Sequence, residues 1–85
     1  MAKYSVIVQP SAQKELEKLP NIIQNKILKA LISLSDNPRP VGCKKLVGSD
    51  SWRVRIGEYR VVYIIEDKVL RIEIIRIANR KDVYR

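Results

Sequence analysis

The chain has 85 residues, 46% of them hydrophobic, so we expect one small domain spanning residues 1–85 rather than a disordered protein. Its net charge of +8 indicates either a basic surface that only keeps the protein soluble or a polyanionic partner. Nucleic acid is the usual partner of this kind, and an acidic protein or an anionic membrane is the alternative. The absence of histidine and the presence of a single cysteine exclude histidine-based catalysis, an internal disulfide and a cysteine-rich zinc site.

The first forty residues predict one strand followed by two helices. Residues 4–8 (YSVIV) alternate loosely before Pro10, which favours a short strand. The next segment, 11–19 (SAQKELEKL), predicts a helix that has Ser11 as its N-cap and ends at Pro20. An apolar stripe at helical spacing then predicts a second helix, which would form an antiparallel hairpin with the first. The stripe consists of Ile23, Ile27, Ala30, Leu31 and Leu34.

The second half of the chain predicts a meander of three strands after a loop rich in Gly, Pro and Ser. Residues 52–56 (WRVRI) alternate between apolar and basic side chains, as a strand with one buried face does. A turn at 57–58 leads into a second alternating segment, 59–65, and a third strand is predicted at 69–78 (VLRIEIIRIA). Two adjacent isoleucines at 74–75 interrupt the alternation of this third strand, which suggests a β-bulge.

These elements predict an α+β fold. Its parts are an N-terminal strand, an antiparallel helical hairpin and a three-stranded antiparallel meander that forms a twisted sheet. The helices must cover one face of the sheet, because their apolar stripes have no other surface to pack on. The opposite face is therefore expected to be at least partly open to solvent.

Basic side chains gather on the predicted hairpin. Arg53 and Arg55 lie two residues apart and project from the same face of one strand, and Arg60 can meet them across the turn if the register permits. Guanidinium groups bind phosphate in bidentate geometry, and Lys44 and Lys45 add positive charge just upstream. The pattern favours a phosphate-binding site, with a solvated outer sheet face as the alternative.

The C-terminal segment adds Arg80, Lys81, Tyr84 and Arg85. Nearby positive charge favours the phenolate of a tyrosine and lowers its pKa from about 10, so Tyr84 could act as a general base. The alternative, and the commoner role for such a residue, is packing on the sheet. The nine carboxylates are scattered along the chain, so we expect neither a metal site nor any other cofactor.

Three segments resemble the RelE/ParE toxin superfamily, and more closely its RelE branch. They are 14–20 (KELEKLP), 44–63 (KKLVGSDSWRVRIGEYRVVY) and 77–85 (IANRKDVYR), of which WRVRIGEYRVVY is the most specific part. The resemblance covers nearly the whole chain. It implies a strand, a helical hairpin and a twisted antiparallel sheet, the same order of elements that the periodicity predicts.

The resemblance implies a toxin of a type II toxin–antitoxin system that cleaves messenger RNA in the ribosomal A site and so inhibits translation. In this family the ribose 2′-hydroxyl attacks the adjacent phosphate without a metal ion. By resemblance, Tyr84 is the general base and Arg80 donates a proton to the leaving oxygen. The resemblance implies that Arg53, Arg55 and Arg60 hold the phosphate and stabilise its developing charge. RNA binding is assigned to the remaining cations near the site, Lys44, Lys45, Lys81 and Arg85.

Two other functions remain open at this point. A ParE-like toxin would inhibit DNA gyrase by binding and would not cut RNA, and a non-catalytic nucleic-acid-binding module would need only the basic face. Either kind of toxin implies a cognate antitoxin, an acidic or amphipathic segment of which could lie along the groove between helices and sheet. The other expected partners are the ribosome and messenger RNA, with operator DNA contacted through the antitoxin as a further possibility. We expect a cytoplasmic protein that does not contact membranes, because no apolar segment approaches membrane-spanning length.

Overall fold

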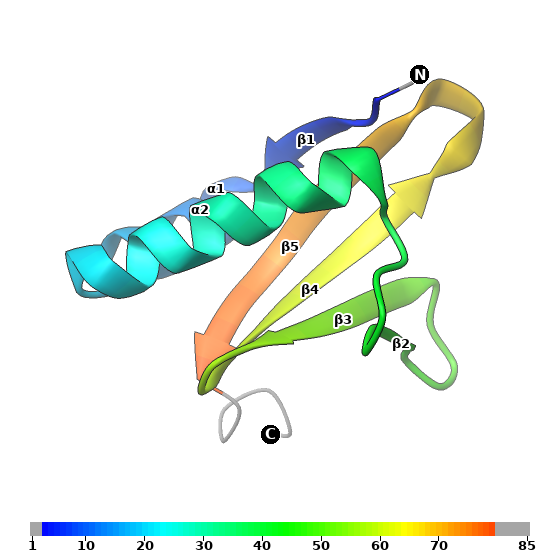
Figure 1. Cartoon of the computed structure of the whole chain (residues 1–85). Coiled ribbons are helices and arrows are strands. Elements are labelled where there is room, and N and C mark those ends of the chain that lie inside the picture. The colour runs from blue at the N-terminus through cyan, green and yellow to red at the C-terminus, as the bar shows by residue number, and fades with distance from the viewer. Residues whose placement is uncertain (1–2, 80–85) are drawn as a thin grey trace.

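The computed structural model describes residues 3–79, and Figure 1 shows how their helices and strands are arranged. In chain order the elements are β1 (Ser5–Val8), α1 (Pro10–Glu17), α2 (Asn21–Asp36), β2 (Lys44–Lys45), β3 (Ser51–Ile56), β4 (Tyr59–Glu66), a 3-10 turn (Asp67–Val69) and β5 (Arg71–Asn79). This order of a strand, two helices and a sheet confirms the predicted α+β fold.

The strands form one sheet in which neighbours follow the order β1-β5-β4-β3-β2. β1 runs parallel to β5, and the other neighbouring strands are antiparallel. The predicted meander is β3–β4–β5. The structure adds β1 at one edge of it and β2 at the other, and β2 lies inside the segment predicted to be a loop.

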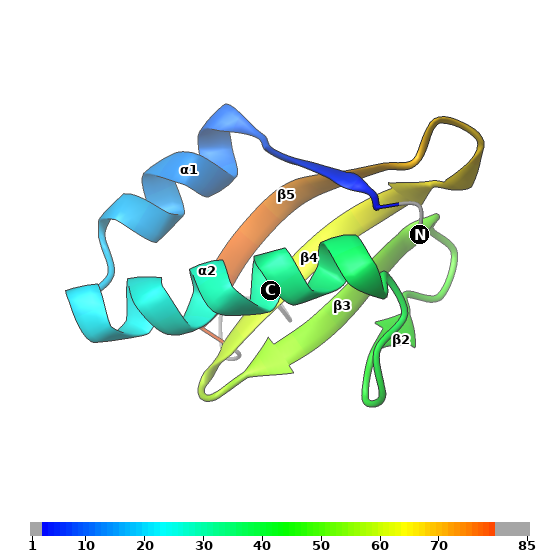
Figure 2. The same cartoon turned by 45° about the horizontal axis from the view of Figure 1, so that its top comes forward.

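Both helices lie on one face of the sheet: α2 crosses in front of the central strands, and α1 lies beside β5 (Figure 2). The prediction of Ser11 as N-cap is wrong: the first helix begins at Pro10, and Gln9 is its N-cap without a capping side-chain hydrogen bond. Proline starts a helix well because its φ is already helical and it has no N–H to satisfy. Within residues 3–79, neither helix is long and apolar enough to cross a membrane.

The hydrophobic core fills the space between the helices and the sheet. Its helical side chains repeat at the spacing of one helix face, which confirms that the predicted stripes point inward. The buried core residues are Ala12, Leu16, Ile27, Leu31, Leu34, Val61, Tyr63, Ile72, Ile74 and Ile77. Trp52 and Tyr59 pack against this core from the same side of the sheet. The other side, which we call the far face, therefore carries the arginines of the alternating pattern.

A β-bulge interrupts the pairing of β4 with β5. Val62 lies opposite Arg76, whereas the next residue, Tyr63, lies opposite Ile74, so Ile75 is the extra residue. This confirms the bulge that the adjacent isoleucines suggested. The bulge shifts the phase of β5 by one residue and thereby sets which side chains of its C-terminal half reach the far face.

The buried hydroxyl of Tyr63 joins the sheet to the segment that follows α2. It donates a 2.8 Å hydrogen bond to the Pro38 carbonyl, and burial raises the pKa of this phenol, so it remains a donor at neutral pH. We expect Tyr63→Phe to lower the free energy of unfolding by about 1–2 kcal/mol, because a buried carbonyl loses its partner. Urea unfolding checks this. Tyr4→Phe, which removes an exposed hydroxyl, should cost clearly less, and equal costs would contradict the assignment.

Candidate functional site

Strand register brings the predicted hairpin cations together on the far face. Arg55 lies directly opposite Arg60 in the β3–β4 hairpin, and Lys44 of β2 lies opposite Arg53. Residues that face each other across strands project from the same side of a sheet. These four side chains and Gly42 line a pocket of about 160 Å³, which we call the cation pocket. The register therefore brings Arg60 to the same side of the hairpin as Arg53 and Arg55, which the sequence alone did not decide.

The tight turn between β3 and β4 fixes this register. Gly57 and Glu58 are the only residues between the two strands, and Gly57 has a φ of 60°. A positive φ at the first turn residue alone is the pattern of a type II′ turn, whose twist matches that of the strands. The Gly57 carbonyl also accepts a 3.0 Å hydrogen bond from Nε of Arg55, which orients that guanidinium.

Apart from Gly42, the residues that line the cation pocket all carry positive charge. Arg53 and Arg60 are half-buried, and Lys44 and Arg55 are exposed. Four like charges at this spacing repel one another, so an anion that enters the pocket relieves the repulsion. Guanidinium groups pair with phosphate oxygens through parallel N–H donors. Because arginine stays protonated, the pocket can bind and stabilise negative charge, but its arginines cannot accept a proton.

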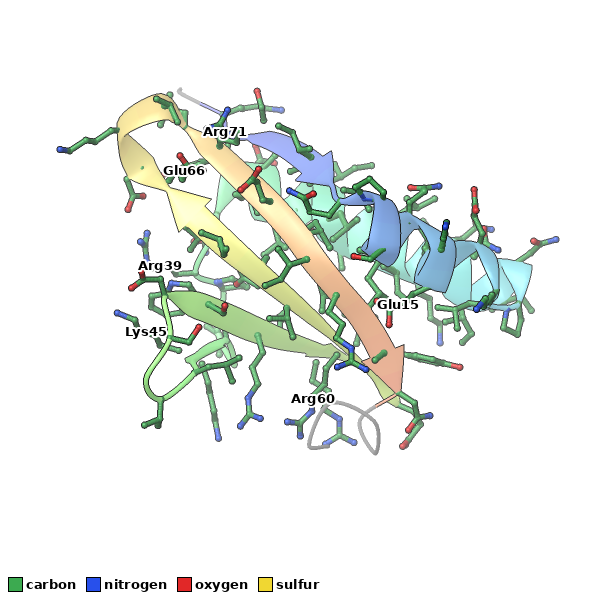
Figure 3. The ribbon with its side chains drawn as sticks, turned by 180° about the vertical axis from the view of Figure 1, so that it is seen from behind. Glu15, Arg39, Lys45, Arg60, Glu66 and Arg71 are labelled. Atoms are coloured by element: carbon green, nitrogen blue, oxygen red, sulfur yellow. The ribbon has the colours of Figure 1, made fainter. Side chains whose placement is uncertain are left out.

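Of the remaining predicted site residues, the structure describes only Lys45, which does not line the cation pocket. Lys45 lies opposite Trp52 and so belongs to the helix-covered side of the sheet. Figure 3 shows it far from Arg60, which lies beside the C-terminal end of β5. The predicted residues Arg80, Lys81, Tyr84 and Arg85 lie outside the described residues.

Three residues of this region were not among the predicted site residues. Gly42 lines the cation pocket from the loop before β2. Val62 and Arg76 extend the row of far-face side chains that begins with Lys44 and Arg53. The alternation in 59–65 did place Val62 on the same face as Arg60, but the position of Arg76 depends on the register across the bulge, which a local pattern does not give.

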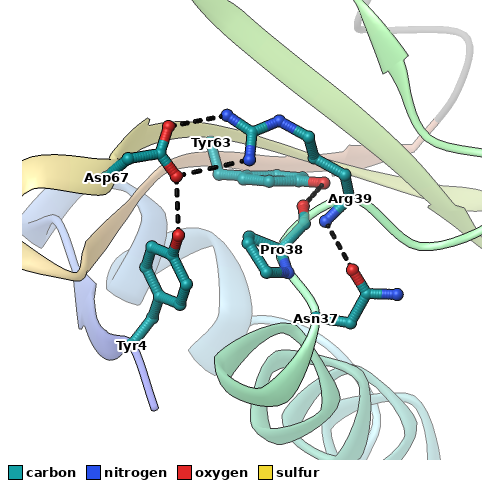
Figure 4. A network of polar contacts seen from close by, with 6 residues as sticks. All are labelled: Tyr4, Asn37, Pro38, Arg39, Tyr63 and Asp67. Carbon is teal, nitrogen blue, oxygen red and sulfur yellow. Dashed lines mark hydrogen bonds and ion pairs between the residues drawn. The ribbon is translucent and has the colours of Figure 1, made fainter. Parts of the chain in front are cut away.

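A polar network anchors the loop that leads to the cation pocket (Figure 4). Arg39 binds the Asp67 carboxylate through both terminal nitrogens, at 2.9 and 3.3 Å, and its guanidinium lies 5.1 Å from the centre of the Trp52 ring. Tyr4 donates a 2.6 Å hydrogen bond to the same carboxylate. These contacts hold the chain at residue 39 against the sheet, three residues before Gly42.

The network makes part of the stability dependent on pH. Hydrogen bonds from Arg39, and then from Tyr4, hold the pKa of Asp67 below its ordinary value. A carboxyl with a lowered folded-state pKa contributes stability above its unfolded pKa of about 3.9, and this contribution disappears as pH falls through the folded pKa.

We therefore expect Asp67→Asn to lower the urea midpoint at pH 7 and to have a much smaller effect at an acidic pH below the folded pKa of Asp67, where the parent carboxyl is also neutral. The effect should be modest, because the pair is half-exposed and screened by solvent. Asp36→Asn, in a more exposed ion pair with Lys3, is the matched control and should change the midpoint less at pH 7. If Asp67→Asn lowers the urea midpoint equally at both pH values, the charge of Asp67 does not contribute to stability.

Comparison with known proteins identifies the family. Residues 6–84 match a family model described as the ParE toxin of the type II toxin–antitoxin system parDE. The chain belongs to the RelE/ParE toxin superfamily. It is 33% identical to the putative toxin RelE1 of Methanocaldococcus jannaschii, over 98% of this chain and 97% of that protein. It is 37% identical to toxin RelE of Mycobacterium tuberculosis, over 96% and 87% of the two chains.

Solved structures of toxins share the fold of this type II toxin. The toxin–antitoxin complex RelBE2 of Mycobacterium tuberculosis contains a chain that matches with a TM-score of 0.85 at 29% identity, over 94% of both chains. A chain of the archaeal RelE–RelB complex from Pyrococcus horikoshii matches with a TM-score of 0.83 at 30% identity, over 92% of this chain and 96% of that one. The family model is described as ParE, whereas these relatives are named RelE.

Proposed function

We propose that this toxin is a ribosome-dependent endoribonuclease that cleaves messenger RNA in the ribosomal A site and thereby inhibits translation. The cation pocket carries the proposal: three arginines and a lysine line a space of about 160 Å³. A site of this charge and size suits one phosphate group of an RNA backbone. The sequence identity to toxins named RelE supports a function of the RelE branch of the superfamily.

The proposed reaction is an internal transfer at phosphorus that needs no metal. The ribose 2′-oxygen forms a bond to the adjacent phosphorus, and the bond from phosphorus to the 5′-oxygen of the next nucleotide breaks. Tyr84 takes the proton of the 2′-hydroxyl, and Arg80 donates a proton to the leaving oxygen or stabilises its charge. The negative charge that builds up on the phosphate oxygens is stabilised by Arg53, Arg55 and Arg60. Binding of the surrounding RNA is assigned to Lys44, Lys81 and Arg85. Lys45 lies on the helix-covered side, so it could contact only RNA that passes around the β2 edge of the sheet.

A cognate antitoxin is the proposed protein partner. Two of the similar solved structures are complexes of a toxin with its antitoxin. An apolar hollow of about 450 Å³ lies between β1 and α2, where Leu28 and Ile32 are exposed. An amphipathic segment could bury these side chains, and acidic residues in it would complement the charge of +8. The other residues that line this hollow are Tyr4, Val6, Val8, Leu31 and Ser35.

Primer extension on a messenger RNA tests the proposed activity. Purified toxin is added with and without programmed ribosomes, and the cut sites are mapped. We expect cuts within A-site codons only when ribosomes are present. Equal cutting without ribosomes would contradict ribosome dependence, and the absence of cuts under both conditions would contradict the endonuclease.

The description of the matching family model favours a second candidate, inhibition of DNA gyrase by binding. A gyrase supercoiling assay with the same protein preparation distinguishes the two. Inhibited supercoiling together with uncut messenger RNA would replace the endonuclease with a ParE-like function.

A further inference from the structure

Positive charge on the far face continues beyond the cation pocket. Lys44 lies opposite Arg53, which lies opposite Val62, which in turn lies opposite Arg76. The row therefore crosses four strands, from β2 to β5, and ends in an arginine that is not part of the pocket. The Arg76 side chain is 45% exposed. Arg76 also lines a hollow with Glu15 and Lys18, so a ligand that leaves the pocket along the far face meets this cation beside α1.

Val62 shows how this surface is packed. It is only 6% exposed, although it lies on the side of the sheet opposite the helices. Its neighbours on that face include Arg53 and Arg76 on the adjacent strands and Arg60 two residues earlier on its own strand. Arginine covers apolar surface with its aliphatic stem and keeps its guanidinium in water. The register places arginine stems next to Val62, so their guanidinium heads can surround it on the far face.

Glu15 of α1 holds Arg76 from the edge of the sheet. Its Oε2 lies 3.5 Å from Nε of Arg76, and its Oε1 accepts a 2.9 Å hydrogen bond from the Ile77 N–H. The pairing of β1 with β5 ends opposite Ile74, so Glu15 takes the place of a strand neighbour beyond the bulge. Because the ion pair is partly exposed and contributes little energy, an anion can compete with Glu15 for Arg76.

We propose that Arg76 is a second phosphate-binding residue and that a single RNA strand crosses the far face from the cation pocket, over Val62, to Arg76. The proposal rests on the proposed function and extends it to the phosphate next to the cleaved one. Strands lie about 4.8 Å apart, so the backbones of Arg53 and Arg76 are separated by about 10 Å, a distance that long arginine side chains and neighbouring phosphates of one strand can span. Glu15 holds Arg76 in place until RNA arrives.

The test measures binding of short 2′-O-methyl RNA, which cannot undergo attack by its 2′-oxygen, by fluorescence anisotropy at several salt concentrations. A dinucleotide offers one internucleotide phosphate and a tetranucleotide offers three. We expect Arg76→Gln to weaken tetranucleotide binding about fivefold at low salt and to make the salt dependence shallower by about 0.7, as for one lost phosphate contact. Dinucleotide binding should not change, and Arg76→Lys should restore the salt dependence.

Arg71→Gln is the matched control. Arg71 lies on the same strand and face, is similarly exposed at 41%, and is also ion-paired, with Glu66, but lies at the other end of the sheet. We expect the Arg71→Gln variant to bind RNA like the parent. Tetranucleotide binding by Arg76→Gln that equals the parent in strength and salt dependence would overturn the inference, as would a parent that binds both oligomers equally.

Glu15→Gln separates a restraint on Arg76 from a structural role. The amide oxygen can still accept the Ile77 hydrogen bond, while the negative charge is removed. We expect about twofold tighter tetranucleotide binding, and no gain when Arg76→Gln is also present. Unchanged or weaker binding would overturn the role of Glu15. Arg60→Ala distinguishes failure of the proposed function from failure of the Arg76 assignment. If both Arg60→Ala and Arg76→Gln bind RNA like the parent, the proposed function fails. If Arg60→Ala weakens binding and Arg76→Gln does not, only Arg76 is wrongly assigned.

Discussion

Replacing Arg60 with alanine is expected to reduce the rate of ribosome-dependent cleavage about 100-fold or more. Arg60 lies opposite Arg55 within the hairpin and lines the cation pocket while half-buried. A cation held in place before the reaction stabilises charge that develops in the transition state, and removal of one such donor typically costs two to three orders of magnitude. Single-turnover cleavage at saturating ribosome concentration measures this rate separately from binding.

The fold should survive this substitution, because Arg60 is only half-buried and does not belong to the hydrophobic core. Arg71→Ala is the matched control, since it removes an arginine from the same face at the far end of the sheet and should retain the parent rate. Arg60→Lys should recover only part of the activity, because lysine cannot form the bidentate pair. An Arg60→Ala variant that unfolds at the parent's urea midpoint and cleaves at the parent's rate would contradict the assignment of Arg60 to the phosphate.

The hairpin that carries the cation pocket was predictable because local chemistry specifies it. Apolar and basic residues alternate from Trp52 to Ile56, a two-residue turn with glycine first sets the register, and the next strand continues the alternation. Once the register is set, Arg55 must face Arg60. The bulge was predictable for a similar reason, since the adjacent isoleucines at 74–75 cannot both follow a period of two.

The parts of the structure that were not predicted depend on contacts between distant segments. The bond from Tyr4 to Asp67 joins residues 63 positions apart, and the pair formed by Arg39 and Asp67 joins residues 28 positions apart. Neither shows in any local period. The short strand β2 is likewise defined by its pairing with β3, because two lysines in a loop rich in Gly, Pro and Ser have no strand pattern of their own.

The same reasoning explains why Arg76 was missed. Its own segment reads as a strand, but the face on which it lies follows from the bulge, and its neighbours follow from the pairing of β4 with β5. The restraint by Glu15 depends in turn on where α1 lies over β5. A local pattern thus predicted the centre of the cation surface, while its extent required the tertiary structure.

Tyr84→Phe is expected to reduce the cleavage rate about 100-fold or more without weakening RNA binding. The arginines of the cation pocket stay protonated, so the proton of the 2′-hydroxyl needs another acceptor, and a general base contributes two to four orders of magnitude. The end of β5 lies beside the cation pocket, because Ala78 lies opposite Arg60. The cleavage rate of the parent should rise with pH while the base loses its proton, and the variant should lose this rise.

Tyr59→Phe is the control for this substitution, because Tyr59 stands at the same end of the sheet but on the helix-covered side, opposite Ile56 and Asn79. Its hydroxyl should be dispensable for cleavage. The decisive comparison is the pH dependence of single-turnover cleavage by the parent and the two variants. If Tyr84→Phe keeps the parent's rate and pH profile, the tyrosine packs or stacks without taking the proton, and the base must be sought on the ribosome or the RNA, since the arginines around the phosphate cannot supply it.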